Sequence, residues 1–259
     1  MSDASNPYES TSVKPPMPSG KMEYMRSIHY VFENPNWVTN VLLVGVCILS
    51  TGIIPVLGQL VCVGYQFGII EALHRRPNAQ YPDFDFNKLM DYLVRGFWIF
   101  LVGLVVGLAM LPIIAGLAVV FAVLVGGAGA AGGDDGAAVA LIVVVPILFV
   151  AMLAIGIAIN MISVPFMLRA GLMQDFGAAF DFGFAKQFIR NTWKEMILCA
   201  LFSMVAGMLA ALIGMAMLCV GIYFTMAVVM LMQGHLILQL YELHLARGGD
   251  AVYLKPEVA

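Results

Sequence analysis

Six polar side chains lie inside the long apolar runs of this sequence, where they could do chemistry. They are Gln66, Asn160, Ser163, His235, Gln239 and Glu242. Asn160 and Ser163 are three residues apart, and the last three residues follow the i, i+4, i+7 spacing of one helix face. Because polar groups inside a bilayer are costly, they are functional candidates by default. Residue counting places Gln66, Asn160 and His235 in the cytoplasmic half of the bilayer, where they could meet between helices.

Two interpretations of this polar cluster are open at this point. The favoured one is hydrogen bonding between helices, which contributes about 0.6 to 2 kcal/mol per interaction. The other is a water-filled cavity or a substrate pathway. Gln59, seven residues before Gln66, and Gln233, two residues before His235, are further polar residues nearby. The arrangement of the helices has to decide between the two.

Residues for catalysis or metal binding do not form a recognisable motif. The sequence has no HExxH, GxSxG or P-loop pattern. Glu71-x-x-His74 matches half of a carboxylate-bridged dimetal site, which needs a second such pair. The comparable segment, Glu242-x-His244, has the wrong spacing. We therefore expect a protein that is not an enzyme, with no catalytic residues, no metal site and no cofactor.

An aromatic and basic phrase occurs twice, as FDFNKLMDYLVRGFW at 84–98 and FDFGFAKQFIRNTW at 180–193. Each phrase places rings on one helical stripe and charges on another, which is typical of a helix lying in the membrane interface. The candidate contacts for anionic lipid headgroups, or for a cytosolic or membrane partner, are the cations Lys88, Arg95, Lys186, Arg190 and Lys194. Simple anchoring in the interface is the alternative.

The composition is that of an integral membrane protein. Of the 259 residues, 61% are hydrophobic and only 11% are charged, whereas soluble domains carry about 25% charged residues. The mean hydropathy is +0.93. The 13 Lys and Arg residues are scattered rather than gathered on one face, which argues against a nucleic-acid partner. The lipid bilayer is the expected partner.

The fold expected is an all-α polytopic bundle with six transmembrane spans. Residues 1–20 form a polar tail that we expect to be disordered and cytoplasmic, residues 21–247 the membrane domain, and residues 248–259 a short cytoplasmic tail. The expected interfacial helices cover about 21–34, 84–95 and 176–193. The expected spans cover about 37–54, 59–73, 96–125, 139–168, 195–215 and 219–243, with a tight turn at 55–58 between the first two and a Gly/Ala/Asp loop between the third and fourth.

The placement of charge supports this partition and predicts an orientation. All 13 Lys and Arg residues fall before the first span, after the last, or in alternate loops. The positive-inside rule therefore places both termini in the cytoplasm, in a multi-pass protein of the cytoplasmic (inner) membrane.

The unit of span, amphipathic segment and span occurs twice in the same orientation. This pattern predicts a weak internal repeat, although any interfacial segment tends to collect Phe, Trp, Lys and Arg. Small residues such as Gly103, Gly107, Gly207 and Gly214 permit close helix contact. The contact is expected mainly within the subunit, with a homo-oligomer as the alternative.

Three segments, FENPNWVTNVLLVG, IPVLGQLVCVGYQFGIIEAL and YPDFDFNKLMDYLVRGFW, resemble the domain-of-unknown-function family 4013. Its members are polytopic membrane proteins of bacteria and archaea, with F-x-x-P-x-W, I-P-x-x-G and P-x-F-D segments. The resemblance covers about residues 30–247 and is sharpest in the first hundred residues. It implies the membrane architecture and assigns no catalytic residues.

These observations favour a non-enzymatic membrane protein that organises lipid or a partner at the cytoplasmic face. The alternative is a small-solute transporter or channel with a polar site between the second, fourth and sixth spans, because transporters place substrate sites near the midplane between repeats.

Overall fold

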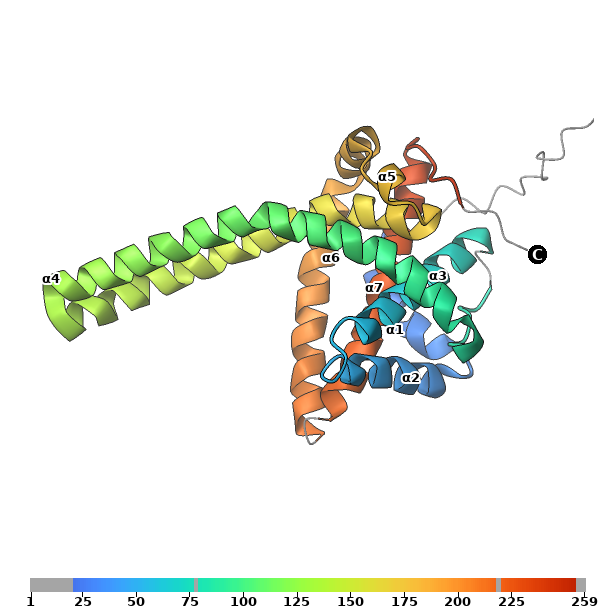
Figure 1. Cartoon of the computed structure of the whole chain (residues 1–259), viewed down its shortest axis with the longest axis horizontal. Coiled ribbons are helices and arrows are strands. Elements are labelled where there is room, and N and C mark those ends of the chain that lie inside the picture. Colours follow the sequence, from blue (N-terminus) through green and yellow to red (C-terminus); the bar gives the residue numbers. More distant parts are fainter. Residues whose placement is uncertain (1–20, 77–78, 218–219, 255–259) are drawn as a thin grey trace, which may run out of the picture.

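The computed structural model describes residues 21–76, 79–217 and 220–254, and every regular element in them is a helix (Figure 1). The expected tail at 1–20, Cys219 and the end of the chain after 254 lie outside the described residues. The elements are α1 (Tyr24–Glu33), α2 (Trp37–Ser50), α3 (Leu57–Arg75), the 3-10 turn η1 (Phe86–Lys88), α4 (Leu89–Met173), α5 (Phe176–Ala179), α6 (Phe182–Ala216) and α7 (Gly221–Ala246).

The helix α4 is a long hairpin that projects from the rest of the molecule (Figure 1). Its chain reverses at Gly133, whose φ of 62° and ψ of −150° are accessible to glycine. The expected Gly/Ala/Asp loop at about 126–138 is instead helical on both sides of this reversal. Alanine is the best helix former, and here it offsets the glycines between which it lies. The two arms of α4 contain the expected third and fourth spans.

Four helical segments are long and apolar enough to cross a bilayer: Phe86–Gly136, Ala138–Met173, Phe182–Ala216 and Gly221–Ala246. The chain is thus a multi-pass membrane protein. The first two expected spans do not reach this standard. The helix α2 has 14 residues, fewer than the roughly 20 that a crossing needs. The apolar residues of α3 are interrupted by Gln59, Gln66 and Glu71.

Helix α3 packs against α2, α4 and α7, and its largest contact is with α4. The two helices cross at a pair of glycines. Gly64 of α3 lies against the backbone carbonyl of Tyr92, and Gly96 of α4 lies against the backbone carbonyl of Leu60. A Cβ atom at either glycine would overlap that carbonyl. Small residues at the crossing therefore bring the two backbones into contact.

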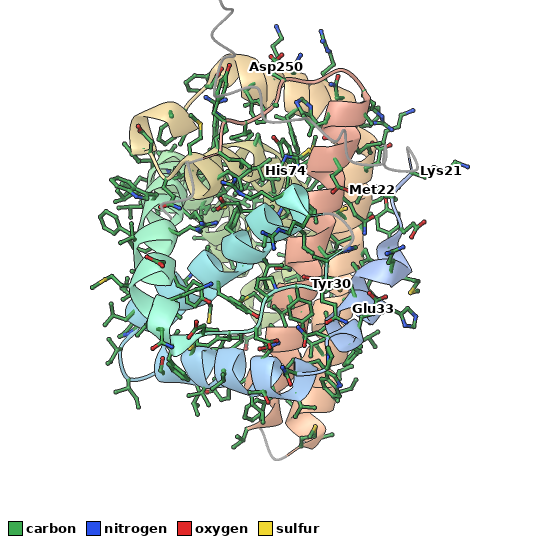
Figure 2. The ribbon with its side chains drawn as sticks, turned by 90° about the vertical axis from the view of Figure 1, so that its right-hand side faces the viewer. Lys21, Met22, Tyr30, Glu33, His74 and Asp250 are labelled. Atoms are coloured by element: carbon green, nitrogen blue, oxygen red, sulfur yellow. The ribbon has the colours of Figure 1, made fainter. Side chains whose placement is uncertain are left out.

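Helix α7 packs against α1, α2, α3 and α6. Tyr30 of α1 lies against α7 (Figure 2). Ser27, Tyr30 and Val31 are the buried residues of α1. Met25 and Phe32, in the segment 21–34 that the sequence assigns to the interface, are 66% and 44% exposed. One face of α1 thus binds the bundle while another face stays free to contact lipid.

The aspartates of the two F-D-F phrases begin helices in the same way. Asp85 accepts a hydrogen bond from the backbone N–H of Asn87 (2.9 Å), and Asp181 accepts one from Phe184 (3.0 Å). Both are N-caps, which satisfy an N–H group that the first turn leaves without a partner. Each helix then continues without a break into an apolar arm, so neither phrase forms a separate interfacial helix. The second Phe of each phrase, Phe86 or Phe182, faces outward.

Asp83 joins the loop before α4 to the start of α2. Its Oδ1 accepts hydrogen bonds from the side-chain amides of Asn34 (3.0 Å) and Asn40 (2.9 Å), and its Oδ2 accepts one from Asn36 (2.7 Å). Asn40 in turn accepts a hydrogen bond from the backbone N–H of Phe84 (2.9 Å). These amides, Asn40 foremost, hold the pKa of Asp83 below its usual range.

We expect Gly64→Ala and Gly96→Ala each to destabilise the protein by about 1–3 kcal/mol, because the added methyl group must push two backbones apart. Gly68→Ala on α3 is the matched control. Its Cβ would meet no atom within 4 Å, so the higher helix propensity of alanine leaves it neutral or stabilising. Thermal unfolding in detergent measures the difference, and equal midpoints for the three variants would contradict this account of the crossing.

We expect Asp83→Ala to destabilise the protein by about 1–3 kcal/mol at pH 7, because the buried amides of Asn34 and Asn40 lose their acceptor. The pKa of Asp83 is depressed in the folded protein. Its contribution to the free energy of unfolding is therefore fully present above the unfolded pKa of about 3.9 and is lost as the pH falls through the lower, folded pKa. The gap between wild type and variant in thermal unfolding should therefore close below about pH 4. Exposed Asp134, replaced by alanine, is the control and should show no such gap.

Candidate functional site

A cavity of about 900 Å³ lies between α3, both arms of α4 and α7. It contains Gln66, Asn160 and Ser163, three members of the polar cluster that the sequence identifies. It adds two polar residues that the sequence analysis noted but left out of the cluster, Gln59 and Gln233. Within the described part of the chain, its other lining residues are apolar or glycine, and none is charged.

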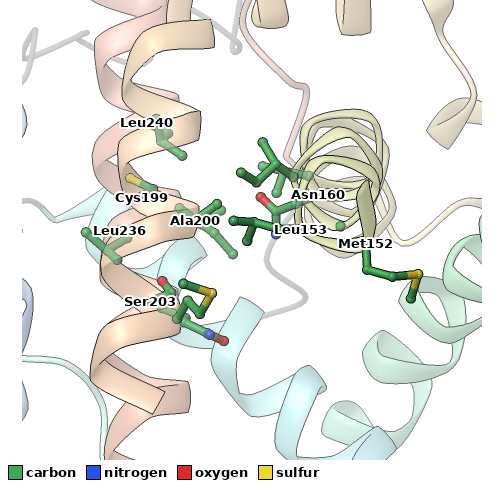
Figure 3. Close-up of a pocket in the computed structure, with 14 residues that line it drawn as sticks. Met152, Leu153, Asn160, Cys199, Ala200, Ser203, Leu236 and Leu240 are labelled. Carbon is green, nitrogen blue, oxygen red and sulfur yellow. The ribbon is translucent and has the colours of Figure 1, made fainter. Parts of the chain in front are cut away.

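A second cavity of about 420 Å³ lies on the other side of the returning arm of α4, against α6 and α7. Asn160 extends into it from α4, opposite Cys199 and Ser203 of α6 (Figure 3). Asn160 and Gln233 line both cavities. The two spaces therefore adjoin at these two amides.

The hydrogen bonds of the polar residues separate structural from free groups. Gln66 donates from Nε2 to the backbone carbonyl of Met230 (2.8 Å) and so connects α3 to α7. Asn160, Ser163 and Gln233 form no side-chain hydrogen bond with any residue that the structure describes. Hydrogen bonding between helices thus explains Gln66. The polar groups of Asn160, Ser163 and Gln233 instead face the cavities.

The remaining members of the predicted cluster lie elsewhere. Gln239 exchanges two hydrogen bonds with the backbone of Glu23, at 2.8 and 3.2 Å, and its Nε2 lies 2.9 Å from Nδ1 of His235. The His235 ring stacks on Tyr30 with centroids 4.4 Å apart. These two side chains hold α1 on α7. Glu242 has no hydrogen bond or ion pair within the described residues and does not line either cavity.

The Glu71-x-x-His74 segment is occupied by internal contacts. Both carboxylate oxygens of Glu71 are engaged, one by Arg75 (2.7 Å) and the other by Arg95 (2.5 Å). The ring of His74 lies 4.9 Å from that of Tyr241 on α7. No group of three or more His, Cys, Asp or Glu side chains that could hold a metal ion occurs among the described residues.

The five candidate cations differ in their surroundings. Arg95 is only 14% exposed, pairs with Glu71 and donates to the backbone carbonyl of Phe67 (3.0 Å). Lys88 is exposed on η1. The other three, Lys186, Arg190 and Lys194, form an exposed row along α6, four residues apart, which we call the cationic stripe.

The cationic stripe has no acidic partner among the residues that the structure describes. Exposed aromatic side chains lie beside it: Phe182 is 73% exposed and Trp193 is 48% exposed. The Nζ atom of Lys194 lies 5.4 Å from the centroid of the Trp193 ring. Cations next to rings are the combination found where a helix enters the headgroup region.

Four arginines outside the stripe form close ion pairs with carboxylates. These ion pairs are Arg75 and Arg95 with Glu71, Arg169 with Asp181 (3.4 Å), and Arg247 with Glu195 (2.6 Å). The pairs of Arg95, Arg169 and Arg247 join different segments of the chain, so their charge is used within the protein. The stripe differs because it places three cations, unpaired within the described residues, on one face of one helix.

Comparison with known proteins identifies a family. A family model described as "Protein of unknown function (DUF4013)" matches residues 47–220, about two thirds of the chain. The match includes α3, α4 and the cationic stripe, and it stops before α7, which supplies Gln233. No curated protein and no solved structure matches the chain. The chain belongs to DUF4013, a family of proteins of unknown function.

Proposed function

We propose that this protein is a non-enzymatic, multi-pass protein of the cytoplasmic membrane that organises anionic lipid headgroups at the cytoplasmic face. The observation that carries the proposal is the cationic stripe, Lys186, Arg190 and Lys194, which is exposed and has no acidic partner among the described residues. A basic residue near an anionic surface contributes about 1 kcal/mol of binding free energy. Three such residues on one helix face form a contact for several headgroups.

The same proposal includes six membrane-embedded helical segments with both termini in the cytoplasm. Its support is a feature of the sequence: the segments 51–56, 126–138 and 217–220 contain no Lys or Arg, whereas the opposite helix ends contain many. The short helix α2 is followed by a reversal with apolar side chains on its surface, including Ile53 at 83% exposure. An apolar reversal of this kind is suited to lipid rather than to water.

The test of the stripe is lipid retention by the triple variant K186Q/R190Q/K194Q. Wild type and variant are reconstituted in nanodiscs that contain equal parts of phosphatidylglycerol and phosphatidylcholine, and the lipids kept after mild detergent extraction are counted by native mass spectrometry. We expect wild type to be enriched in phosphatidylglycerol and the variant to lose most of that enrichment. High salt should weaken the enrichment as well, because exposed charges are screened.

The double variant R26Q/R76Q is the control, because it removes exposed cations that lie outside the stripe and outside the five candidate contacts. It should keep the enrichment. If the triple variant retains anionic lipid as well as wild type does, the proposal is wrong. If the triple variant instead loses only a co-purifying protein, the stripe binds a protein partner and the lipid proposal is wrong too.

A small-solute transporter or channel is the second candidate, favoured by the cavity that brings together Gln66, Asn160 and Ser163 from α3 and α4. Its lining is mainly apolar and uncharged, which disfavours ions and charged solutes. We expect proteoliposomes to show no flux of K⁺, Na⁺ or glucose above that of empty liposomes. Flux that Asn160→Leu abolishes and Asp134→Asn leaves intact would move the function to transport.

A further inference from the structure

The cavity between α3, α4 and α7 is suited to a molecule with a long apolar body. Seventeen of its 22 lining residues are apolar or glycine. Along the first arm of α4 it extends from Gly96 to Ile114, roughly 27 Å at 1.5 Å per residue. That length exceeds the roughly 15 Å of one bilayer leaflet, and the volume of about 900 Å³ is in the range of known ligand sites.

The polar groups in the cavity are neutral hydrogen-bonding groups. Asn160 of α4 and Gln233 of α7 present side-chain amides, each with two N–H donors, that have no partner within the described residues. An amide without a partner in an apolar setting costs free energy that a ligand carbonyl can recover. A charged group would find no counter-ion among the lining residues.

The surroundings of the molecule supply a ligand with both properties. The arms of α4 expose apolar side chains along their length, so the lipids of the bilayer surround the cavity. A glycerolipid has an apolar acyl chain and, at its head end, a neutral ester carbonyl that accepts hydrogen bonds. Its headgroup remains outside a cavity that offers no charge to it.

We propose that this cavity binds one acyl chain of a membrane glycerolipid, with its ester carbonyl accepting a hydrogen bond from the amide of Asn160 or Gln233. The site is separate from the cationic stripe, because Lys186, Arg190 and Lys194 do not line it. It selects the chain and the ester, whereas the stripe selects the headgroup. The proposal for the cavity can therefore be contradicted without contradicting the proposal for the stripe, and the reverse is also true.

Glycines in the lining allow a test that fills the cavity without disturbing the fold. Gly107 and Gly156 line the cavity, and a Cβ atom at either would meet no atom within 4 Å. Gly107→Phe and Gly156→Leu therefore place their side chains in open space. Gly116→Phe is the matched control, since Gly116 is equally open but does not line the cavity.

The probe is a phosphatidylcholine with a photoreactive diazirine in its acyl chain, incorporated into nanodiscs with the full-length protein. After irradiation, peptide mass spectrometry locates the labelled residues. We expect labels on lining residues of α3, α4 and α7, reduced at least fivefold in Gly107→Phe and in Gly156→Leu and unchanged in Gly116→Phe. The stripe variant K186Q/R190Q/K194Q should label as wild type does.

A second comparison tests the hydrogen bond to the ester. An ether-linked analogue of the probe lacks the carbonyl, so wild type should label it about two- to tenfold less, the value of one net hydrogen bond. The variant N160L/Q233L should label the two probes equally. The proposal is overturned if labels spread evenly over the outer surfaces of the helices, or if both filled variants label like wild type. Equal labelling of the two probes by wild type would overturn the hydrogen bond to the ester.

Discussion

The requirement that a polar group be satisfied in an apolar surrounding determines how this molecule is built around α3. That helix carries Gln66 and Glu71 between apolar residues, and each finds its partner on another helix. Gln66 requires the Met230 carbonyl of α7, and Glu71 requires Arg95 of α4. The glycine crossing of α3 and α4 brings the backbones close enough for the second pairing. The cavity lies along the same helices, and its lining combines the paired Gln66 with Asn160, Ser163 and Gln233, which are unpaired among the described residues.

The sequence predicts the helical class and the apolar arms, because apolar run length is a local property. It does not predict where the arms start, because the Asp N-caps begin each helix inside the F-D-F phrase, ahead of the expected spans. It does not predict that α2 has only 14 residues, since hydropathy alone extends a span through an apolar reversal. It also treats the glycine-rich segment near Gly133 as a loop, whereas the alanines there keep the helix going on both sides. Where one arm ends and the next begins depends on packing as much as on composition.

The candidate site is predicted only in part, for a geometric reason. Gln66, Asn160 and Ser163 do share a cavity, but helical spacing places Gln233 and His235 about 200° apart on α7. His235 and Gln239, four residues apart, therefore face α1, and Gln233 faces the cavity. Side chains that share a depth in the bilayer need not share a helix face, and which face of α7 meets α4 is a tertiary property. The cationic row on α6 is predictable because its spacing of four keeps it on one face.

The hydrogen bond between Gln66 and Met230 also implies a delay during synthesis, between the making of the donor and the making of its acceptor. The two residues are 164 positions apart, and chains grow at about 5–20 residues per second, so Gln66 exists for roughly 10 to 30 s before its acceptor is made. Helix α2 is made before α3 and contacts it, and Arg95 follows Glu71 by only about two dozen residues, so α2 and the first arm of α4 exist well before α7. The order of the helices in the gene thus becomes an order of assembly in which α7, made last, supplies the acceptor for Gln66.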